Sequence, residues 1–229
     1  MTGNIRWNYY YKINKEGIKS ESNLLYTPYI NHENTIMCMH YAQNPDYQSD
    51  KIIPEEILEY FFHREIRFLY LLEKEFYTPI IFNVDQTERK IFIEFPGETL
   101  AQILFDPNRS LDKECPNWRE QLYNILLSLK NNGCYKLALY PHCFFLSDDK
   151  IIKTIDYYSI VPFNESIIQR SLIEPIIGKL GEYRFDNSTI NSMVDLGKVF
   201  NITCMHHLNN YWIENPFATY YIELFEGDL

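Results

Sequence analysis

The sequence has no apolar run that approaches the roughly 20 residues a helix needs to span a bilayer. Its first residues, MTGNIR, do not resemble a secretory signal peptide. Positive charge is also scarce, because 21 Lys and Arg residues against 31 Asp and Glu residues give a net charge of −10. Such an acidic chain is a poor match for nucleic acid or an anionic membrane surface. These absences predict a soluble cytoplasmic protein whose principal partner is neither nucleic acid nor membrane.

Cysteine and alanine are both sparse. Five cysteines, odd in number and scattered over 229 residues, are typical of a reducing compartment. Cys204, with the histidines at 206 and 207, would suit a metal site together with His142 or Cys143, but helical groupings of this kind more often pack in a core. Only four alanines accompany 19 tyrosines. This composition is typical of an AT-rich genome, such as that of a phage, a large DNA virus or an AT-rich bacterium.

Glycine is too sparse to build a common phosphate-binding loop. The chain has eight glycines, and neither G-x-x-x-x-G-K-[ST] nor G-x-G-x-x-G occurs in it. Residues 14–20 (NKEGIKS) predict a hairpin turn with one glycine, whereas a cradle of backbone amides around phosphates requires several. A nucleotide site in this chain would therefore differ from the common ones.

The patterns that are present follow a definite order. Three segments before residue 96 are short, apolar and β-prone: residues 35–42, 80–82 and 91–95. A helix is predicted over residues 54–76, which begin with proline and two acids. Pro96 and Gly97 then break the strand pattern and mark a hinge. Beyond the hinge come two helical patterns and a hairpin: residues 98–105, 118–133 and 143–155. This order indicates an α+β chain that forms one compact, two-lobed domain.

Residues 136–143 (KLALYPHC) and 156–158 (DYY) resemble two motifs of the protein kinases. In that family a catalytic loop H-R-D-L-x-x-x-N precedes a hairpin and the metal-binding D-F-G motif. Ala138 falls at the loop aspartate, Cys143 at the asparagine five residues later, and Asp156 at the D-F-G aspartate after thirteen more. The resemblance implies a protein-kinase-like fold: a small N-terminal lobe, residues 1–96, with a five-stranded antiparallel sheet, and a minimal, mainly helical C-terminal lobe, residues 97–229.

The same resemblance implies chemical roles that this chain fills poorly. Asp156 matches the metal ligand, and the cofactors implied are Mg²⁺ and ATP. Ala138 has no group that could act as the base, and the Cys143 thiol is a poor ligand for a hard cation. Tyr158 replaces the D-F-G glycine. From the residues alone, the ordinary interpretation of Asp156 is a strand-end acid that caps the next turn. Asp156 is therefore a candidate metal ligand, and no catalytic residue is assigned.

Glu65 is a candidate for nucleotide binding because it interrupts the apolar face of the helix over residues 54–76. It resembles the kinase helix glutamate that pairs with a strand lysine. A buried carboxylate needs a partner, so this interpretation predicts a basic side chain from the N-terminal sheet within reach. The alternative is an edge position, with Glu65 paired to Arg64, Arg67 or water.

Two further candidates for nucleotide binding lie on predicted strands. His40 ends the best match to the V-A-I-K strand of the kinases, but a mostly neutral imidazole is a weak phosphate clamp. Lys12 or Lys19, on the preceding strands, would have to supply the missing lysine. Glu94 lies on the strand before the hinge.

Three hypotheses about function are consistent with these residues. The first is a catalytically impaired, kinase-like binding or scaffolding module whose partner is another protein. The second is a divergent ATP-dependent phosphotransferase or nucleotidyltransferase that keeps Asp156 as its metal ligand. The third is an unrelated α+β interaction protein. A fold cannot separate the first two, because function depends on the site.

Overall fold

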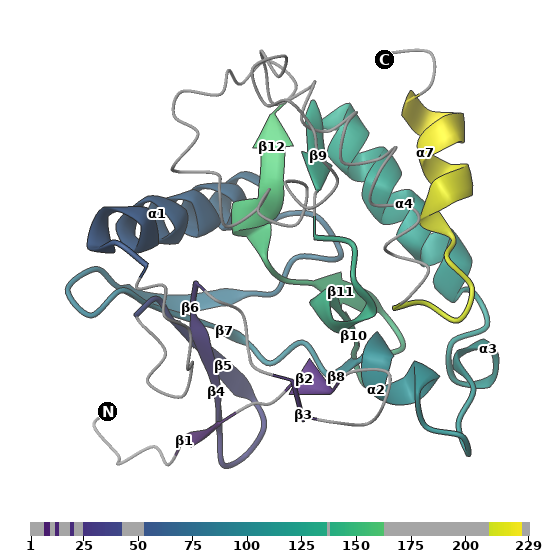
Figure 1. The fold of residues 1–229 in the computed structure, drawn as a ribbon, viewed down its shortest axis with the longest axis horizontal. Helices are drawn as coiled ribbons and strands as arrows, with labels where there is room; N and C mark the ends of the chain where they lie inside the picture. Colours follow the sequence, from purple (N-terminus) through teal and green to yellow (C-terminus); the bar gives the residue numbers. More distant parts are fainter. Residues whose placement is uncertain are drawn as a thin grey trace.

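The computed structural model describes residues 7–9, 12–13, 19–20, 25–42, 53–136, 138–162 and 211–225. They form a mixed α/β structure in which the long helix α1, Glu55–Leu71, and the later helices lie on opposite sides of the molecule (Figure 1). No helix in these ranges is long and apolar enough to cross a membrane. The sequence features at residues 14–18 and 204–207 lie outside the described residues.

The main sheet has the strand order β1-β4-β5-β7-β6, and every neighbouring pair is antiparallel. Its body consists of four five-residue strands: β4 Thr27–Asn31, β5 Ile36–His40, β6 Ile81–Asp85 and β7 Lys90–Glu94. The three-residue β1, Trp7–Tyr9, pairs along the edge of β4. Lys12 and Lys19 lie on strands that precede β5, as the sequence predicted. These strands, β2, Lys12–Ile13, and β3, Lys19–Ser20, pair with each other outside the main sheet.

Helix α1 begins after Pro54 with Glu55 and Glu56 in its first turn, where acids interact favourably with the helix dipole. Its apolar face packs into the core together with alternate residues of two strands: Met37 and Met39 of β5, and Ile91 and Ile93 of β7. The predicted helix end at residue 76 is wrong. The helix ends at Leu71, and residues 72–78 turn so that Tyr77 is fully buried, with its hydroxyl 3.1 Å from the Ser128 hydroxyl.

Gly97 determines how the chain leaves the sheet. Its φ of +111° is rarely adopted by other residues, and an added Cβ would lie 2.1 Å from the carbonyl oxygen of Leu146. Glycine therefore allows the hinge to approach the end of β10, Phe144–Leu146. β8, Glu98–Thr99, follows directly and pairs with β10, whose other neighbour is β11, Ile152–Thr154. The hairpin predicted over residues 143–155 is confirmed.

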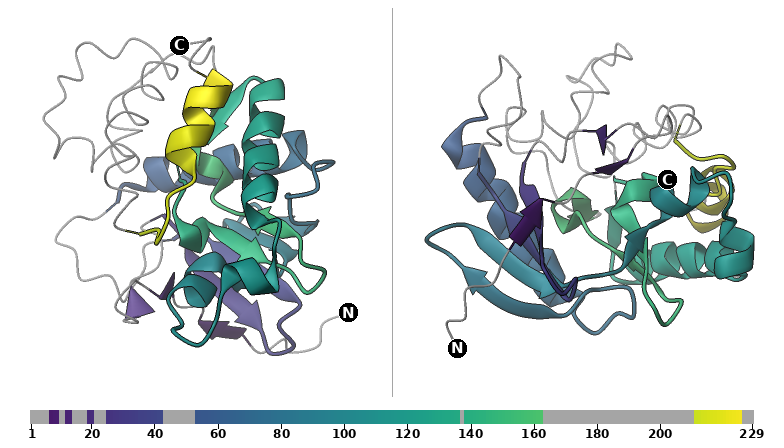
Figure 2. Two further views of the ribbon diagram at one scale, coloured as in Figure 1. Left: turned by 90° about the vertical axis from the view of Figure 1, so that its right-hand side faces the viewer. Right: turned by 90° about the horizontal axis from the view of Figure 1, so that it is seen from below.

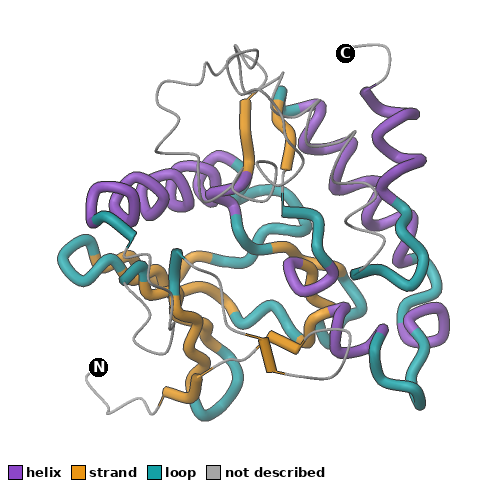
Figure 3. Tube along the Cα trace, viewed as in Figure 1, coloured by secondary structure: helices purple, strands orange, loops and turns teal. Residues whose placement is uncertain are grey.

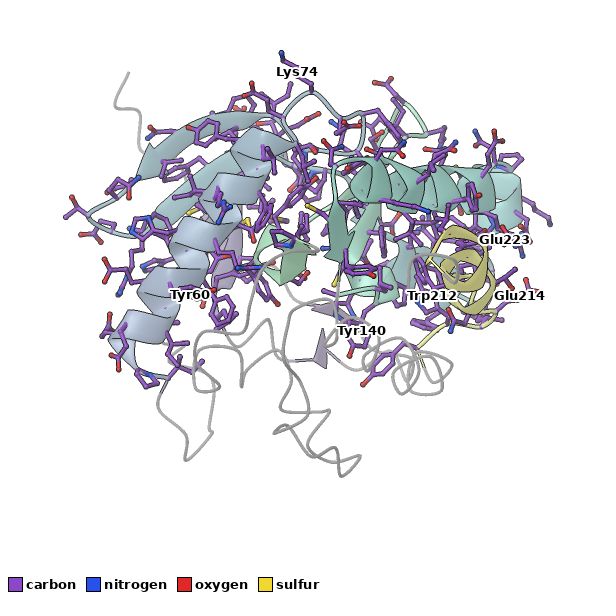
Figure 4. The ribbon with its side chains drawn as sticks, turned by 90° about the horizontal axis from the view of Figure 1, so that it is seen from above. Tyr60, Lys74, Tyr140, Trp212, Glu214 and Glu223 are labelled. Carbon is purple, nitrogen blue, oxygen red and sulfur yellow. The ribbon has the colours of Figure 1, made fainter. Side chains whose placement is uncertain are left out.

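The described helices beyond the hinge are α2 Leu100–Leu104, α3 Leu111–Glu114, α4 Trp118–Asn131 and α7 Phe217–Phe225. Helices α4 and α7 lie side by side, far from α1 (Figure 2). Trp118 of α4 stacks on Trp212, whose indole N–H donates to the carbonyl of Leu139 at 2.9 Å. Trp212 lies beside α7 in Figure 4. This contact anchors the C-terminal segment to the loop that carries Ala138.

Two short antiparallel strands bring the kinase-like motifs together. β9, Cys134–Lys136, pairs with β12, Ile160–Pro162. The 3-10 turn η1, Pro141–Cys143, comes after β9 in the chain. A second 3-10 turn, η2, Tyr157–Ser159, comes directly before β12. The loops that join these elements run through the middle of the molecule, between α1 and α4 (Figure 3). The pairing sets the loop over residues 136–143 against residues 156–160.

Candidate functional site

Asp156 lies at the centre of the site, two residues after the end of β11, and its side chain is fully buried. Its backbone is in the left-handed region, with φ 63° and ψ 48°. One carboxylate oxygen accepts a hydrogen bond from the hydroxyl of Tyr26, and the other lies 3.0 Å from Sγ of Cys143. Although Asp156 precedes the turn η2, its side chain makes no capping hydrogen bond there. The strand-end capping interpretation is therefore wrong, and the carboxylate points into the protein.

Glu65 of α1 is also fully buried, as the interruption of the apolar face predicts. Its Oε2 accepts a hydrogen bond from the backbone N–H of Tyr158 at 2.5 Å and another from the Tyr41 hydroxyl at 3.2 Å. Its Oε1 is buried and has no hydrogen-bond partner among the described residues. Burial, and then the nearby charge of Asp156, raise the pKa of Glu65 to about 7. Glu65 accepts these hydrogen bonds from two tyrosines, and not from the basic side chain of the sheet that the sequence predicted.

Arg64, the neighbour of Glu65 in α1, is buried rather than exposed. Its Nε donates to the carbonyl of Tyr158 at 2.9 Å, and its Nη2 donates to the carbonyl of Ile160 at 2.6 Å. Glu65 and Arg64 thus hold the N–H and the C=O of the same residue, Tyr158. The hypothesis that Arg64 pairs with Glu65 at the helix edge is wrong, and the two residues instead fasten α1 to the chain just after Asp156.

His40 does not reach Glu65. Successive side chains of a strand point to opposite faces, and β5 directs Met37 and Met39 towards α1. His40 therefore lies on the opposite face, where it lines a pocket with Lys90. Tyr41, one residue later, extends towards Glu65 instead. The strand match that ended in His40 is displaced by one residue, so a phenol occupies the position expected for the lysine.

Lys136 is a site residue that sequence reasoning missed. Its side chain is fully buried, and its Nζ donates to three oxygens: Ile155 O at 2.5 Å, Asp156 O at 3.0 Å and Ser159 Oγ at 3.3 Å. The ammonium also lies 5.8 Å from the ring centre of Tyr157. Lys136 stands at the histidine of the H-R-D pattern. A charged residue beside the apolar Leu137 and Leu139 was the signal that could have revealed it.

Ala138 and Glu94 contribute little to the site. Ala138 lies next to it, and its backbone N–H is 3.3 Å from the hydroxyl of Ser159, but its methyl group offers no chemistry. The Glu94 carboxylate forms an ion pair with Lys153 at 2.5 Å and accepts from the Ile80 N–H at 3.3 Å. The structure thus gathers Glu65, Cys143 and Asp156, with Ala138 beside them. It leaves His40 and Glu94 in other contacts.

The donor set around Asp156 does not suit Mg²⁺. That ion requires several oxygen ligands in near-octahedral geometry. Both Asp156 oxygens are already bonded within the chain, and the neighbouring Cys143 offers a soft sulfur. Among the described residues, no group of three or more His, Cys, Asp or Glu side chains is arranged to hold a metal ion. The residues therefore do not fit the metal that the kinase resemblance implies.

No protein-family model and no curated protein sequence matches the chain. Among solved structures, the chain is similar to crystal structures of WbdD. The 2.2 Å structure aligns with a TM-score of 0.50 and 14% identity over 87% of this chain and 45% of that chain. Monomeric WbdD gives 0.48 and 17% over 77% and 44%. A structure described as the bifunctional kinase-methyltransferase WbdD gives 0.47 and 17% over 79% and 43%.

At this level of identity the likeness concerns the fold alone. The chain has kinase-like structural neighbours and spans less than half the length of the WbdD chains it resembles. A mixed α/β structure with antiparallel sheets agrees with the fold class expected from residues 136–158. The comparisons give no support to a phage or viral source.

Proposed function

We propose that this chain is a kinase-like binding module whose partner is another protein, and that it does not transfer phosphate. Within WbdD, the kinase rather than the methyltransferase is the relevant likeness, because the two motifs around Ala138 and Asp156 follow the kinase order. The cytoplasmic location and the two lobes, residues 1–96 and 97–229, are parts of the same proposal.

The single observation that carries the proposal is that the central acids are bonded within the chain. Tyr26 and Cys143 bond the Asp156 carboxylate, and Tyr41 bonds Glu65. Phosphoryl transfer depends on several groups that position the phosphates and neutralise their charge. Here phenols are directed at both acids, and Ala138 offers no base.

Exposed apolar side chains support a protein as the partner. Four large residues at the end of α1 and around β6 are more than half exposed: Tyr70, Leu71, Ile80 and Phe82. Phe82 lies at an irregularity in the pairing of the edge strand β6 with β7. Exposed apolar groups of this size often mark surfaces that contact other proteins. A protein partner that binds the wild type should not bind Phe82→Asp, and the melting temperature of this variant should be unchanged. Lys74→Asp is the control and should still bind the partner. The Lys74 side chain projects outward from the molecule (Figure 4).

The catalytic part of the proposal is tested with radiolabelled ATP and Mg²⁺ or Mn²⁺, beside an Asp156→Ala control. We expect no incorporation or hydrolysis by either protein and no thermal shift on titration with ATP and Mg²⁺. Activity of the wild type that disappears in Asp156→Ala would refute the proposal.

A divergent phosphotransferase or nucleotidyltransferase is the second candidate, and one observation favours it. The Glu65 Oε1 atom is buried and has no hydrogen-bond partner among the described residues. Burial and the nearby charge of Asp156 raise the pKa of Glu65 to about 7. Perturbed, coupled acids are common in active sites. On this alternative the tyrosines would move aside when substrate binds, and the same assay would show Asp156-dependent transfer.

A further inference from the structure

The face of the main sheet that is turned away from α1 contains a pocket of about 300 Å³. Five residues of three adjacent strands line it: Tyr29, Cys38, His40, Lys90 and Phe92. The strand register explains this lining. Cys38 of β5 is paired with Tyr29 of β4 on one side and with Phe92 of β7 on the other. A small thiol thus lies between a phenol and a phenyl ring in the lining of the pocket.

Lys90 gives one end of this pocket a positive charge. It is paired with His40 across the strands, so the two polar groups lie side by side at that end. Burial raises the pKa of the Cys38 thiol to about 12 and lowers the pKa of His40, and Lys90 is the charged group with the largest effect on both pKa values. Asp85, Glu88 and Arg89 act on these groups more weakly.

Lys90 is able to receive a further anion. Its contact with Glu88 is 3.4 Å long, and the Glu88 side chain is 58% exposed. Exposed ion pairs of this kind contribute little free energy. Asp85 is the register partner of Lys90 on β6, and its Oδ1 accepts hydrogen bonds from the N–H groups of Thr87 and Glu88 in the turn.

We propose that this pocket binds a small aromatic carboxylate, separately from the Asp156 site on the other side of the sheet. The aromatic ring lies over Cys38 between Tyr29 and Phe92, where edge and face contacts with both rings stabilise it. The carboxylate accepts a charge-assisted hydrogen bond from Lys90. The neutral His40 imidazole has one donor and one acceptor nitrogen beside it. The ring supplies most of the affinity, and Lys90 selects the acid over its uncharged analogue.

The test compares 2-naphthoate with 2-naphthamide, which has the same rings and no charge, by NMR titration of the full chain. We expect the wild type to bind 2-naphthoate about tenfold more tightly than 2-naphthamide. Lys90→Met should remove that preference and leave the binding of 2-naphthamide unchanged. Cys38→Leu should fill the pocket and weaken both ligands. Lys74→Met, an exposed charge change outside the pocket lining, is the matched control and should behave as the wild type.

The outcomes separate clearly. Amide shifts on β4, β5 and β7, with the preference for the acid lost only in Lys90→Met, would support the proposal. If Cys38→Leu fails to fold, the proposal is decided by the binding of 2-naphthoate and 2-naphthamide to Lys90→Met. Absence of binding at millimolar ligand, shifts that map to other elements, or equal binding of 2-naphthoate by Lys90→Met and the wild type would overturn it.

Discussion

Glu65 couples the stability of the fold to pH. Its pKa is raised from 4.5 to about 7 by burial and by Asp156, so the folded chain binds this proton more tightly than the unfolded chain does. The resulting stabilisation is complete below about pH 4.5 and is lost as the pH rises through about 7. Glu65→Gln cannot ionise. The free energy of unfolding of the wild type, relative to Glu65→Gln, should fall by on the order of 3 kcal/mol between pH 4.5 and 7.5.

Urea unfolding at a series of pH values measures this effect. Glu73→Gln, at an exposed position, provides the control and should follow the wild type throughout. A constant difference between Glu65→Gln and the wild type across the range would show that Glu65 does not hold its proton in the folded state.

Tyr26 stabilises the fold through one hydrogen bond to a buried carboxylate. Tyr26→Phe keeps the ring, which packs 5.2 Å from the ring of Tyr41, but removes the donor to Asp156. Loss of a hydrogen bond to a buried charged group costs about 2 kcal/mol. Calorimetry or urea unfolding should show this loss. Tyr70→Phe, at a position 52% exposed, should change stability little, and an equal loss in both variants would contradict the assignment.

Residue patterns predicted the positions of the central acids better than their partners. The inward direction of Glu65 could be predicted because Glu65 lies on the same face of α1 as the apolar residues that form the core. Its partner could not, because the one-residue difference between His40 and Tyr41 reverses the face of the strand. Tyr26 offered no local signal, since the contact with Asp156 joins positions 130 residues apart.

At the scale of elements, the junction between β7 and β8 depends on Gly97. Gly97→Ala would combine an unfavourable φ with a Cβ that collides with the backbone of Leu146, and should destabilise the chain by about 3 kcal/mol or more. Gly133 is the matched control. Its φ is +67°, but an added Cβ meets nothing within 4 Å, so Gly133→Ala should cost only about 1 kcal/mol. Thermal unfolding of the two variants compares the values, and equal losses would show that the contact at Leu146 does not matter.

Helix α1 is fastened to residues 158–160 by Arg64. Arg64→Lys keeps the charge, but one ammonium cannot reproduce the two directed bonds to Tyr158 and Ile160. We expect peptides that contain residues 157–162 to exchange amide hydrogens at least about tenfold faster in this variant. Arg67→Lys, on the exposed side of the same helix, should not change the exchange. Unaltered exchange in Arg64→Lys would show that α1 is held by its apolar face alone.

Elements with strong local signals were predictable, and their ends were not. Proline and two acids identify the start of α1, and the turn residues 147–150 identify the hairpin of β10 and β11. The end of α1 depends on the burial of Tyr77 against Ser128, a contact that no local pattern contains. Likewise, no local sequence pattern in β9 or in β12 indicates that these two strands pair with each other.

At the scale of the whole molecule, side-chain contacts join the expected lobes, residues 1–96 and 97–229, along much of their boundary. Four examples are Tyr26 with Asp156, Glu65 with Tyr158, Thr78 with Tyr157, and Glu94 with Lys153. Three of the four involve the residues that follow β11. The break in the strand pattern at Pro96 and Gly97 was predictable from the sequence, whereas the extent of this contact was not, because it arises from long-range pairs.

These contacts predict that the two parts unfold together. Amides of β5 and β7 on one side and of α4 on the other should report the same urea midpoint in hydrogen-exchange experiments, as in a single cooperative transition. Enzymes that close on a nucleotide require lobes that move apart and together. Here, separation of the lobes would expose the charges of Glu65 and Asp156 and break their bonds to Tyr158 and Tyr26. A single midpoint, unchanged by ATP and Mg²⁺, is therefore the behaviour of a rigid binding module. Two midpoints would show that the lobes unfold independently, and would favour a cleft that opens for substrate.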